Sequence, residues 1–338
     1  MTHPTRRGRA LRKLALRLVA LVALFWIIAS IVDLHEVADS LGAFSPGIIA
    51  LGFGLGLLRA FLLSVRWRIL DEAGIAEREA ALGHPLTHLR QWQYFRYRLA
   101  NATFNLFLPT AVGADVARAA LMASEVADDR TRRVLVILFD RIIGLVSIGV
   151  LGLIAGIIAP NLAHKEKYVT AIAILNVVLF SILALGFSGW VRTLAHGIFR
   201  RLGSPGVKLS RTTDAIGECF DTFLRHKRHV MAATAVCIAV HATSFVLVWL
   251  AAFALGVELS YATLAIVTTI SWVIVLVPVT IGGLGLREVA FVVLLAPQGV
   301  SEADATALSL FQFAVIVMVG IAGIPVTVFG KASRTTAD

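Results

Sequence analysis

The feature that most constrains this chain is a series of apolar runs, each long enough to cross the hydrocarbon core of a membrane. A membrane-spanning helix needs about 20 predominantly apolar residues, and such runs recur along all 338 residues. Hydrophobic residues make up 58% of the sequence and charged residues 15%, whereas soluble domains carry about 25% charged residues. The sequence therefore predicts an all-α, polytopic membrane helix bundle that forms one integral membrane domain over residues 1–338.

The apolar runs indicate about eight membrane-crossing segments. Six runs are long enough to cross alone, namely 14–32, 46–65, 134–159, 168–187, 230–255 and 305–329. Two shorter apolar runs lie within 261–295, and hydropathy equally allows two full spans or one re-entrant hairpin there.

Basic residues fall on alternate connections, which predicts the orientation. Arginines and a lysine open the chain at 6–17, the connection 33–39 is acidic without Lys or Arg, and Lys331 and Arg334 follow the last run. Because cytoplasmic connections carry an excess of Lys and Arg, both termini are expected on the cytoplasmic side of the inner membrane. The net charge of +10 then reflects orientation and attraction to anionic lipid, and no nucleic-acid partner is expected.

Two basic segments also carry apolar residues. Segment 190–229 has apolar positions at helical spacing, including Ile216, Cys219, Phe220 and Phe223, which predicts amphipathic helices on the cytoplasmic face. Attachment to the membrane surface is favoured over binding of a partner protein. The mixture of arginines and aromatic residues at 90–98 likewise suits a helix in the interface.

Two short stretches interrupt apolar runs in the same way. Each has Pro, then Gly four residues later, then Arg five residues after that. The residues expected to break the helices are Pro109, Gly113, Pro278, Gly282, Gly283 and Gly285. Pro removes a backbone donor and Gly loosens the chain, and in lipid such a break is tolerated only beside protein or a wet cavity.

The two breaks are expected to enter the membrane from opposite sides. Stretch 101–121 is too short to cross twice and both of its flanks are basic, so it is interpreted as a re-entrant hairpin from the cytoplasm. The break at 277–290 would enter from outside. Opposed broken helices of this kind are typical of the inverted repeats of transporters.

The charged residues near the breaks indicate an anion site. Arg118 and Arg287 each open a helical segment, where free N–H groups and a planar guanidinium both suit phosphate. The candidate substrate-binding residues are Arg118, Asp115, Asp140, Arg141, Arg287 and Glu288. We expect them to line one cavity that takes the head group of a phosphate-bearing amphiphile.

Several other polar groups receive less weight. Arg59 lies inside the second apolar run, and a side chain that reaches the head groups is favoured over one that faces the interior. Arg66, Trp67 and Arg68 end that run and are interpreted as an interface anchor. Asp128 and Asp129 are interpreted as a solvated turn.

No catalytic set is visible. The sequence has no nucleophile elbow, P-loop, zinc motif or dinucleotide fingerprint, so no ATP hydrolysis, no catalytic residue and no cofactor is expected. His84 and His88 are spaced like metal ligands, but Pro85 lies between them and no third ligand is evident, so no metal site is predicted.

The motifs together resemble a known family. The stretch from Phe104 to Pro109, with Gly113, Asp115 and Arg118, is similar to the first signature of the flippase-like transmembrane domain of lysylphosphatidylglycerol synthases. Asp140-Arg141 and the stretch 282–288 resemble the other two, in the same order, and the resemblance covers nearly the whole chain. It implies a bundle with re-entrant helices that moves lipid between leaflets, often as a homodimer.

The resemblance leaves the lipid open. In the full-length synthases the domain translocates phosphatidylglycerol that a fused cytosolic domain has aminoacylated. The sequence up to Asp338 has no room for such a domain, so aminoacylation is not expected of this chain. The expected partner is a membrane phospholipid, a polyprenyl-linked sugar or another amphiphile.

The favoured function is a lipid flippase that does not use ATP. A first alternative is an integral lipid-modifying transferase, in which Asp115 or Asp140 would act as acid or base. A second is a membrane partner protein without transport activity, acting through segment 190–229.

Overall fold

The computed structural model describes residues 34–108, 111–126, 128–160, 162–187, 193, 204–275 and 285–329. Within these ranges the regular structure is helical, with no strand. The helices are α2 (Leu34–Gly42), α3 (Pro46–Glu72), α4 (Ile75–Leu82), α5 (Gln91–Phe107), α6 (Ala111–Glu125), α7 (Arg130–Ile158), α8 (Lys165–Phe187), α10 (Ser204–Arg225), α11 (Lys227–Ala254), α12 (Tyr261–Val275), α13 (Leu286–Leu295), the 3₁₀ turn η2 (Ala296–Gln298), α14 (Glu302–Ala322) and α15 (Ile324–Phe329).

Five helical segments in the described part of the chain are long and apolar enough to cross a membrane. They are Pro46–Glu72, Arg130–Ile158, Lys165–Leu185, Lys227–Ala254 and Glu302–Thr327. These match five of the six long runs predicted from sequence, and the first run, 14–32, lies outside the described residues. The protein is therefore an integral membrane helix bundle, with α12 as a shorter apolar helix of 15 residues.

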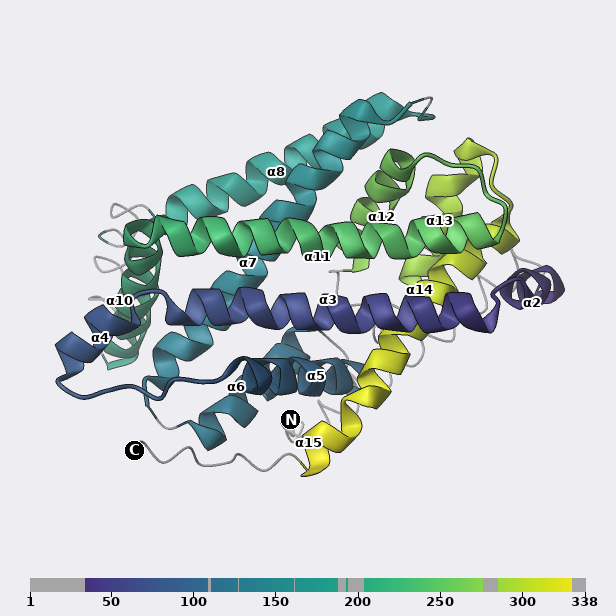
Figure 1. Cartoon of the computed structure of the whole chain (residues 1–338). Helices are drawn as coiled ribbons and strands as arrows, with labels where there is room; N and C mark the ends of the chain where they lie inside the picture. Colours follow the sequence, from purple (N-terminus) through teal and green to yellow (C-terminus); the bar gives the residue numbers. More distant parts are fainter. Residues whose placement is uncertain are drawn as a thin grey trace, which may run out of the picture.

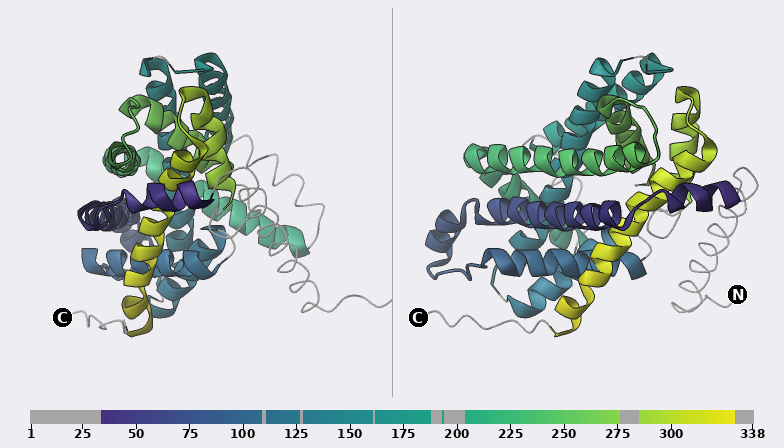
Figure 2. Two further views of the ribbon diagram at one scale, coloured as in Figure 1. Left: turned by 90° about the vertical axis from the view of Figure 1, so that its right-hand side faces the viewer. Right: turned by 45° about the vertical axis from the view of Figure 1, so that its right-hand side comes forward.

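The long helices α3 and α11 lie side by side along most of their length (Figures 1 and 2). Figure 1 shows α4 and α10 at one end of the bundle, which we call the α4 end, and α2 at the opposite end, which we call the α2 end. Helices α5 and α6 pack against each other on one side of α3, and α12 and α13 pack against each other near the α2 end.

Local sequence explains where two of the spanning helices begin. The Ser45 hydroxyl accepts a hydrogen bond from Ile48 N–H at 3.4 Å, and Pro46 occupies the first helical position of α3. Ser301 caps α14 in the same way through Asp304 N–H at 3.0 Å. Such caps satisfy backbone donors that have no partner within the helix.

Two apolar cores hold the bundle together. At the α2 end, α11, α12, α13 and α14 enclose a core that includes Phe291, Leu295 and Leu308, none of them exposed. At the α4 end, a second core joins α3, α5, α7 and α10 around Trp67 and Val136. Helices in lipid associate largely through close van der Waals contact, and these two cores supply such contact at the two ends of the bundle.

Helix α10 uses its apolar face differently from the prediction. Cys219, Phe220 and Phe223 are buried against α7, where Phe223 stacks on Phe139 with ring centroids 3.9 Å apart. The interpretation of this stripe as a membrane-surface attachment was therefore wrong, because periodicity shows that a helix has an apolar face but not what covers it. The helix expected at 191–202 lies outside the described residues, apart from Thr193.

Candidate functional site

Each predicted break is followed by a new helix. Helix α5 ends at Phe107 and α6 begins at Ala111, with Gly113 in its first turn. Helix α13 begins after Gly285, which has a φ of 85°. That left-handed value favours glycine. The other four residues expected to break the helices, Pro109, Pro278, Gly282 and Gly283, lie outside the described residues.

The first group of candidate residues meets where α6 packs against α5 and α7. Asp115 lies 3.1 Å from Arg118 Nη2 and 2.8 Å from Arg141 Nε. Asn101 of α5 donates a third interaction to the same carboxylate, at 3.2 Å. One aspartate therefore organises cations from two helices.

Asp140 lies beside this group but has a different main partner. Its carboxylate accepts a hydrogen bond from Arg66 Nε of α3 at 2.6 Å, and both side chains are almost fully buried. The second end of the Arg66 guanidinium donates to Cys237 Sγ of α11 at 2.8 Å. The guanidinium fits because Gly144 has no side chain: a Cβ there would lie 3.2 Å from Arg66 Nη1.

Electrostatic interactions join these groups into one cluster. Arg118 interacts with Asp115, Asp140, Arg66 and Arg141, and Arg98 of α5 interacts with Arg118, Asp140, Asp115 and Arg66. We call this set the arginine cluster; its members are Arg66, Arg98, Arg118, Arg141, Asp115 and Asp140. Four arginines against two aspartates leave a formal charge of +2.

Arg118 retains unused hydrogen-bonding capacity. Its side chain is 1% exposed, and its guanidinium carbon lies 4.5 Å from the centre of the Trp67 ring. Two of its donors, Nε and Nη1, are buried without a hydrogen-bond partner. A buried donor of this kind is costly to leave unpaired, so both donors are available to a further hydrogen-bond acceptor.

The depth of the cluster follows from helix geometry. Arg66 lies six residues before the end of α3, and Asp140 ten residues after the start of α7. At 1.5 Å per residue these positions are about 9 and 15 Å from the helix ends at the α4 end of the bundle. The cluster thus lies in the half of the bundle near the α4 end. Arg66 and Asp140 hold it within the length of two helices that are long enough to cross a membrane.

Arg287 and Glu288 form a separate group in the first turn of α13. Arg287 is 4% exposed, lies over the Phe313 ring of α14 at 5.2 Å, and is 3.8 Å from Glu288. Glu288 accepts hydrogen bonds from Ser309 at 2.9 Å and from the Gly285 N–H. Arg287 Nε and Nη2 are buried without a hydrogen-bond partner.

The six candidate residues expected to line one cavity therefore form two separate groups of contacts in the structure. Helix α13 packs mainly on α12 and α14, whereas α6 packs mainly on α5 and α7. Within the described residues, the electrostatic partner of Arg287 is Glu288 and does not include the arginine cluster. The two Pro-Gly stretches look alike in sequence, but their helices dock against different neighbours.

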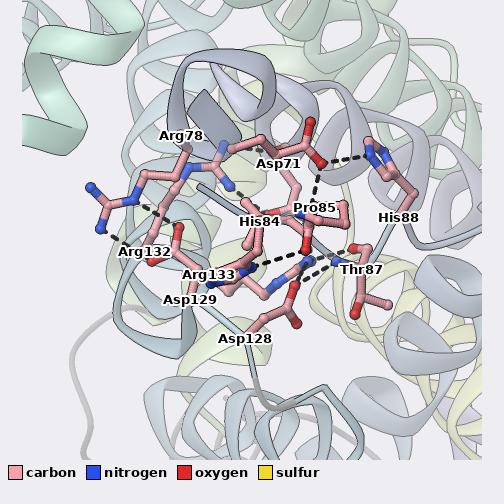
Figure 3. A network of polar contacts seen from close by, with 12 residues as sticks. Asp71, Arg78, His84, Pro85, Thr87, His88, Asp128, Asp129, Arg132 and Arg133 are labelled. Atoms are coloured by element: carbon pink, nitrogen blue, oxygen red, sulfur yellow. Dashed lines mark hydrogen bonds and ion pairs between the residues drawn. The ribbon is translucent and has the colours of Figure 1, made fainter. Parts of the chain in front are cut away.

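A third polar network closes the α4 end of the bundle (Figure 3). Asp71 of α3 is 1% exposed and accepts hydrogen bonds from Tyr94 Oη at 2.6 Å and Arg133 Nη1 at 2.7 Å. Arg133 also donates to Thr87 O at 2.6 Å, and Arg132 binds the same end of α3. This network ties α3, α5 and α7 together beyond the arginine cluster.

Two acidic residues expected to form a solvated turn belong to this network. Asp129 lies 3.2 Å from Arg78, and Asp128 accepts a hydrogen bond from Thr87 N–H. The side chain of Asp129 is 6% exposed. The interpretation was wrong because the partners of this pair come from a loop and a helix about 40 to 50 residues earlier in the chain.

Neighbouring polar residues are explained by local contacts. His88 lies 3.2 Å from Glu79, and the His84 ring lies 3.1 Å from Pro85 O. The described residues contain no group of three metal-ligating side chains. A hydrogen bond from Leu86 N–H holds the pKa of the Glu79 carboxyl below its ordinary value.

Sequence reasoning missed four residues of the site. Arg66 and Trp67 were interpreted as an interface anchor, yet they are 3% and 0% exposed. Arg98 was assigned to an interfacial helix, and Asn101 was not considered as a ligand of Asp115. The sequence does place Arg66 and Arg98 at the borders of apolar runs. That position did not identify them as site residues, because residues of an interface anchor occupy the same position.

Comparison with known proteins identifies the family. Neither the curated proteins nor the solved structures contain a match to this chain. Residues 14–323 match the family described as the lysylphosphatidylglycerol synthase TM region. Because the match covers most of the sequence, the chain belongs to the family of lysylphosphatidylglycerol synthase transmembrane regions.

Proposed function

We propose that this protein is a lipid flippase that moves an anionic, phosphate-bearing lipid between membrane leaflets without hydrolysing ATP. The observation that carries the proposal is the charge of the arginine cluster, where four arginines face two aspartates. A cationic side chain at membrane depth costs about 2.5–3.5 kcal/mol on insertion scales. An anionic ligand would offset that cost.

The donors in the cluster suit phosphate better than a small cation. Guanidinium groups are planar, permanently charged and matched to phosphate oxygens. The unpartnered Nε and Nη1 of Arg118 can donate two such bonds. The acyl chains would remain in the bilayer while the head group occupies the cluster.

The proposed route uses two pairs of short helices as re-entrant hairpins. Helices α5 and α6 have 17 and 15 residues, and α12 and α13 have 15 and 10. At 1.5 Å per residue they are about 15–26 Å long, which is less than the roughly 30 Å of hydrocarbon. We place the basic α4 end at the cytoplasmic face of the inner membrane. The α5–α6 hairpin would then enter from the cytoplasm and the α12–α13 hairpin from outside, as in inverted-repeat transporters.

The same geometry favours translocation over covalent chemistry. The two aspartates that could act as acid or base, Asp115 and Asp140, are each held in ion pairs with arginine. Such pairing occupies the carboxylate oxygens that an acid or base would need free. We therefore propose that the protein is not an enzyme.

The test is lipid transfer in liposomes that contain the purified protein. Fluorescent phosphatidylglycerol in the inner leaflet is protected from an added reductant until it crosses. We expect faster loss of protection than in protein-free vesicles, and about 10- to 100-fold slower transfer by Arg118→Gln, as expected for one lost charge-assisted hydrogen bond. Arg68→Gln is the matched control because Arg68 also lies on α3 but has a side chain that is 41% exposed and paired with Glu72.

Two results would contradict the proposal. One is transfer by the wild-type protein no faster than in empty vesicles across several phosphate-bearing lipids. The other is a new covalent lipid species, detected by mass spectrometry only in cells that make the protein. The second result would favour the transferase instead.

A further inference from the structure

Arg59 lies at the centre of a membrane-spanning helix. Helix α3 runs from Pro46 to Glu72, so Arg59 is thirteen residues from each end. At 1.5 Å per residue that is about 20 Å from either end. The preference for a side chain that reaches the head groups was therefore wrong, and the structure shows where the side chain points instead.

The Arg59 guanidinium faces the interior of the bundle. Its central carbon lies 4.7 Å from the centre of the Trp272 ring of α12. Its Nε is buried without a hydrogen-bond partner. A cation held over an indole ring is only modestly stabilised, so this contact does not replace a counter-ion at this depth.

No carboxylate forms a salt bridge with Arg59 in the part of the chain that the structure describes. Its electrostatic neighbours include Arg66, which repels it, and Cys237. His241 of α11 also interacts with both arginines. The mid-depth cation thus differs from Arg66, Arg118 and Arg141, each of which has an aspartate partner.

Arg59 connects the helix that carries Arg66 of the arginine cluster with the pair of helices that carries Arg287. It is seven residues from Arg66, so the two lie on one face of α3, about 10 Å apart along the axis. On the other side, Trp272 follows Ser271, whose hydroxyl is fully buried and has no hydrogen-bond partner. Ser271 is on α12, which packs against the helix that carries Arg287.

We propose that Arg59, seated on Trp272, binds the phosphate of the lipid head group halfway across the membrane, between the arginine cluster and Arg287. This inference rests on the proposed function. A phosphate that leaves the arginine cluster would meet Arg59, which no carboxylate of the described residues neutralises. The phosphate would then have a cationic partner while it crosses the apolar centre of the membrane. The same residue would select anionic over uncharged head groups.

Photolabelling tests the binding site directly. The probe is phosphatidylglycerol with a diazirine on its head-group glycerol, reconstituted with the full chain and mapped by peptide mass spectrometry. We expect label on the peptides that contain Arg59 and Trp272 as well as near Arg118. Arg59→Gln should remove the label at Trp272 and retain the label near Arg118.

Transfer measurements separate charge from structure. Arg59→Gln should slow transfer of phosphatidylglycerol about 10- to 100-fold, whereas Arg59→Lys keeps the charge and should stay within about threefold of wild type. The exposed-arginine variant Arg68→Gln should transfer at the wild-type rate. Glucosylceramide, which lacks phosphate, should cross no faster with the wild type than with Arg59→Gln.

The outcomes distinguish the two proposals. Label at Trp272 without lipid transfer by the wild type would refute the flippase and retain the binding site. Absence of label at Trp272, or wild-type transfer by Arg59→Gln, would overturn the role of Arg59 alone. Equal loss in Arg59→Lys and Arg59→Gln, together with a lower melting temperature, would show that Arg59 only supports the fold.

Discussion

Asp140→Asn is the substitution that most directly probes how charge is held inside the bundle. The wild-type pair joins Arg66 Nε and Asp140 Oδ1 at 2.6 Å, with side-chain exposures of 4% and 3%. Removing one partner of a buried pair leaves the other charge uncompensated and typically costs 3–5 kcal/mol. Asparagine retains an acceptor oxygen and Arg66 keeps its bond to Cys237, so we expect the lower end, about 3 kcal/mol.

The assay is reversible unfolding in mixed detergent micelles, with increasing SDS and tryptophan fluorescence as the signal. About 3 kcal/mol corresponds to a change of more than a hundredfold in the ratio of folded to unfolded protein. The control is Arg68→Gln, which breaks a pair with side-chain exposures of 41% and 39%. Exposed pairs contribute about 0–1 kcal/mol, so this variant should unfold close to wild type.

A double variant tests the reason for the loss. Arg66→Met with Asp140→Leu removes both charges, leaves the net charge of the arginine cluster unchanged, and should recover stability to within about 1 kcal/mol of wild type. The reasoning is refuted if Asp140→Asn unfolds within about 0.5 kcal/mol of wild type. It is also refuted if the double variant is as unstable as the single one, because packing rather than charge would then be responsible.

Two further predictions concern the α4 end. Asp71→Asn should lower the free energy of unfolding by about 3 kcal/mol, since Arg133 stays buried without its closest carboxylate and keeps only Asp128 at 3.6 Å. An unchanged unfolding midpoint would contradict the network in Figure 3. Phe223→Ala should loosen α10 from Phe139 and expose Cys219, whose thiol pKa burial raises to about 11. A raised pKa keeps the thiol protonated at pH 8, so exposure should speed maleimide labelling of Cys219 by about 100-fold. Peptide mass spectrometry distinguishes labelling at Cys219 from labelling at Cys237. An unchanged labelling rate at Cys219 would refute the packing of α10 on α7.

The long helices were predictable because lipid imposes a strict rule on sequence. Backbone polar groups must be satisfied internally in hydrocarbon, so an apolar run such as 230–255 can only be a helix, and α11 spans Lys227–Ala254. The breaks were predictable from Pro and Gly, which act within a few residues. Helix α13 begins at Leu286, so Arg287 lies in its first turn as the sequence indicated. Helix α6 begins earlier than expected, at Ala111, so Gly113 lies within the helix and Arg118 lies seven residues after its start; the prediction that Arg118 opens the segment was wrong.

The members of the candidate site were only partly predictable. Asp115, Arg118, Asp140 and Arg141 were recognised as charges in or beside apolar runs, and the structure brings them together. Arg66 was missed because its partner Asp140 lies 74 residues away. A terminal arginine that anchors at the interface and one that turns inward have the same local sequence.

The sequence by itself determined that this chain forms spanning helices, where they are interrupted, and which side chains carry charge into the apolar runs. These properties depend on residues close together in the chain and on the surrounding lipid. Only the tertiary structure decided that Arg118 and Arg287 belong to separate groups, that α10 packs on protein, and that Arg59 faces Trp272. Those outcomes depend on how helices dock and rotate against one another, and helical periodicity does not specify which neighbour covers a given face.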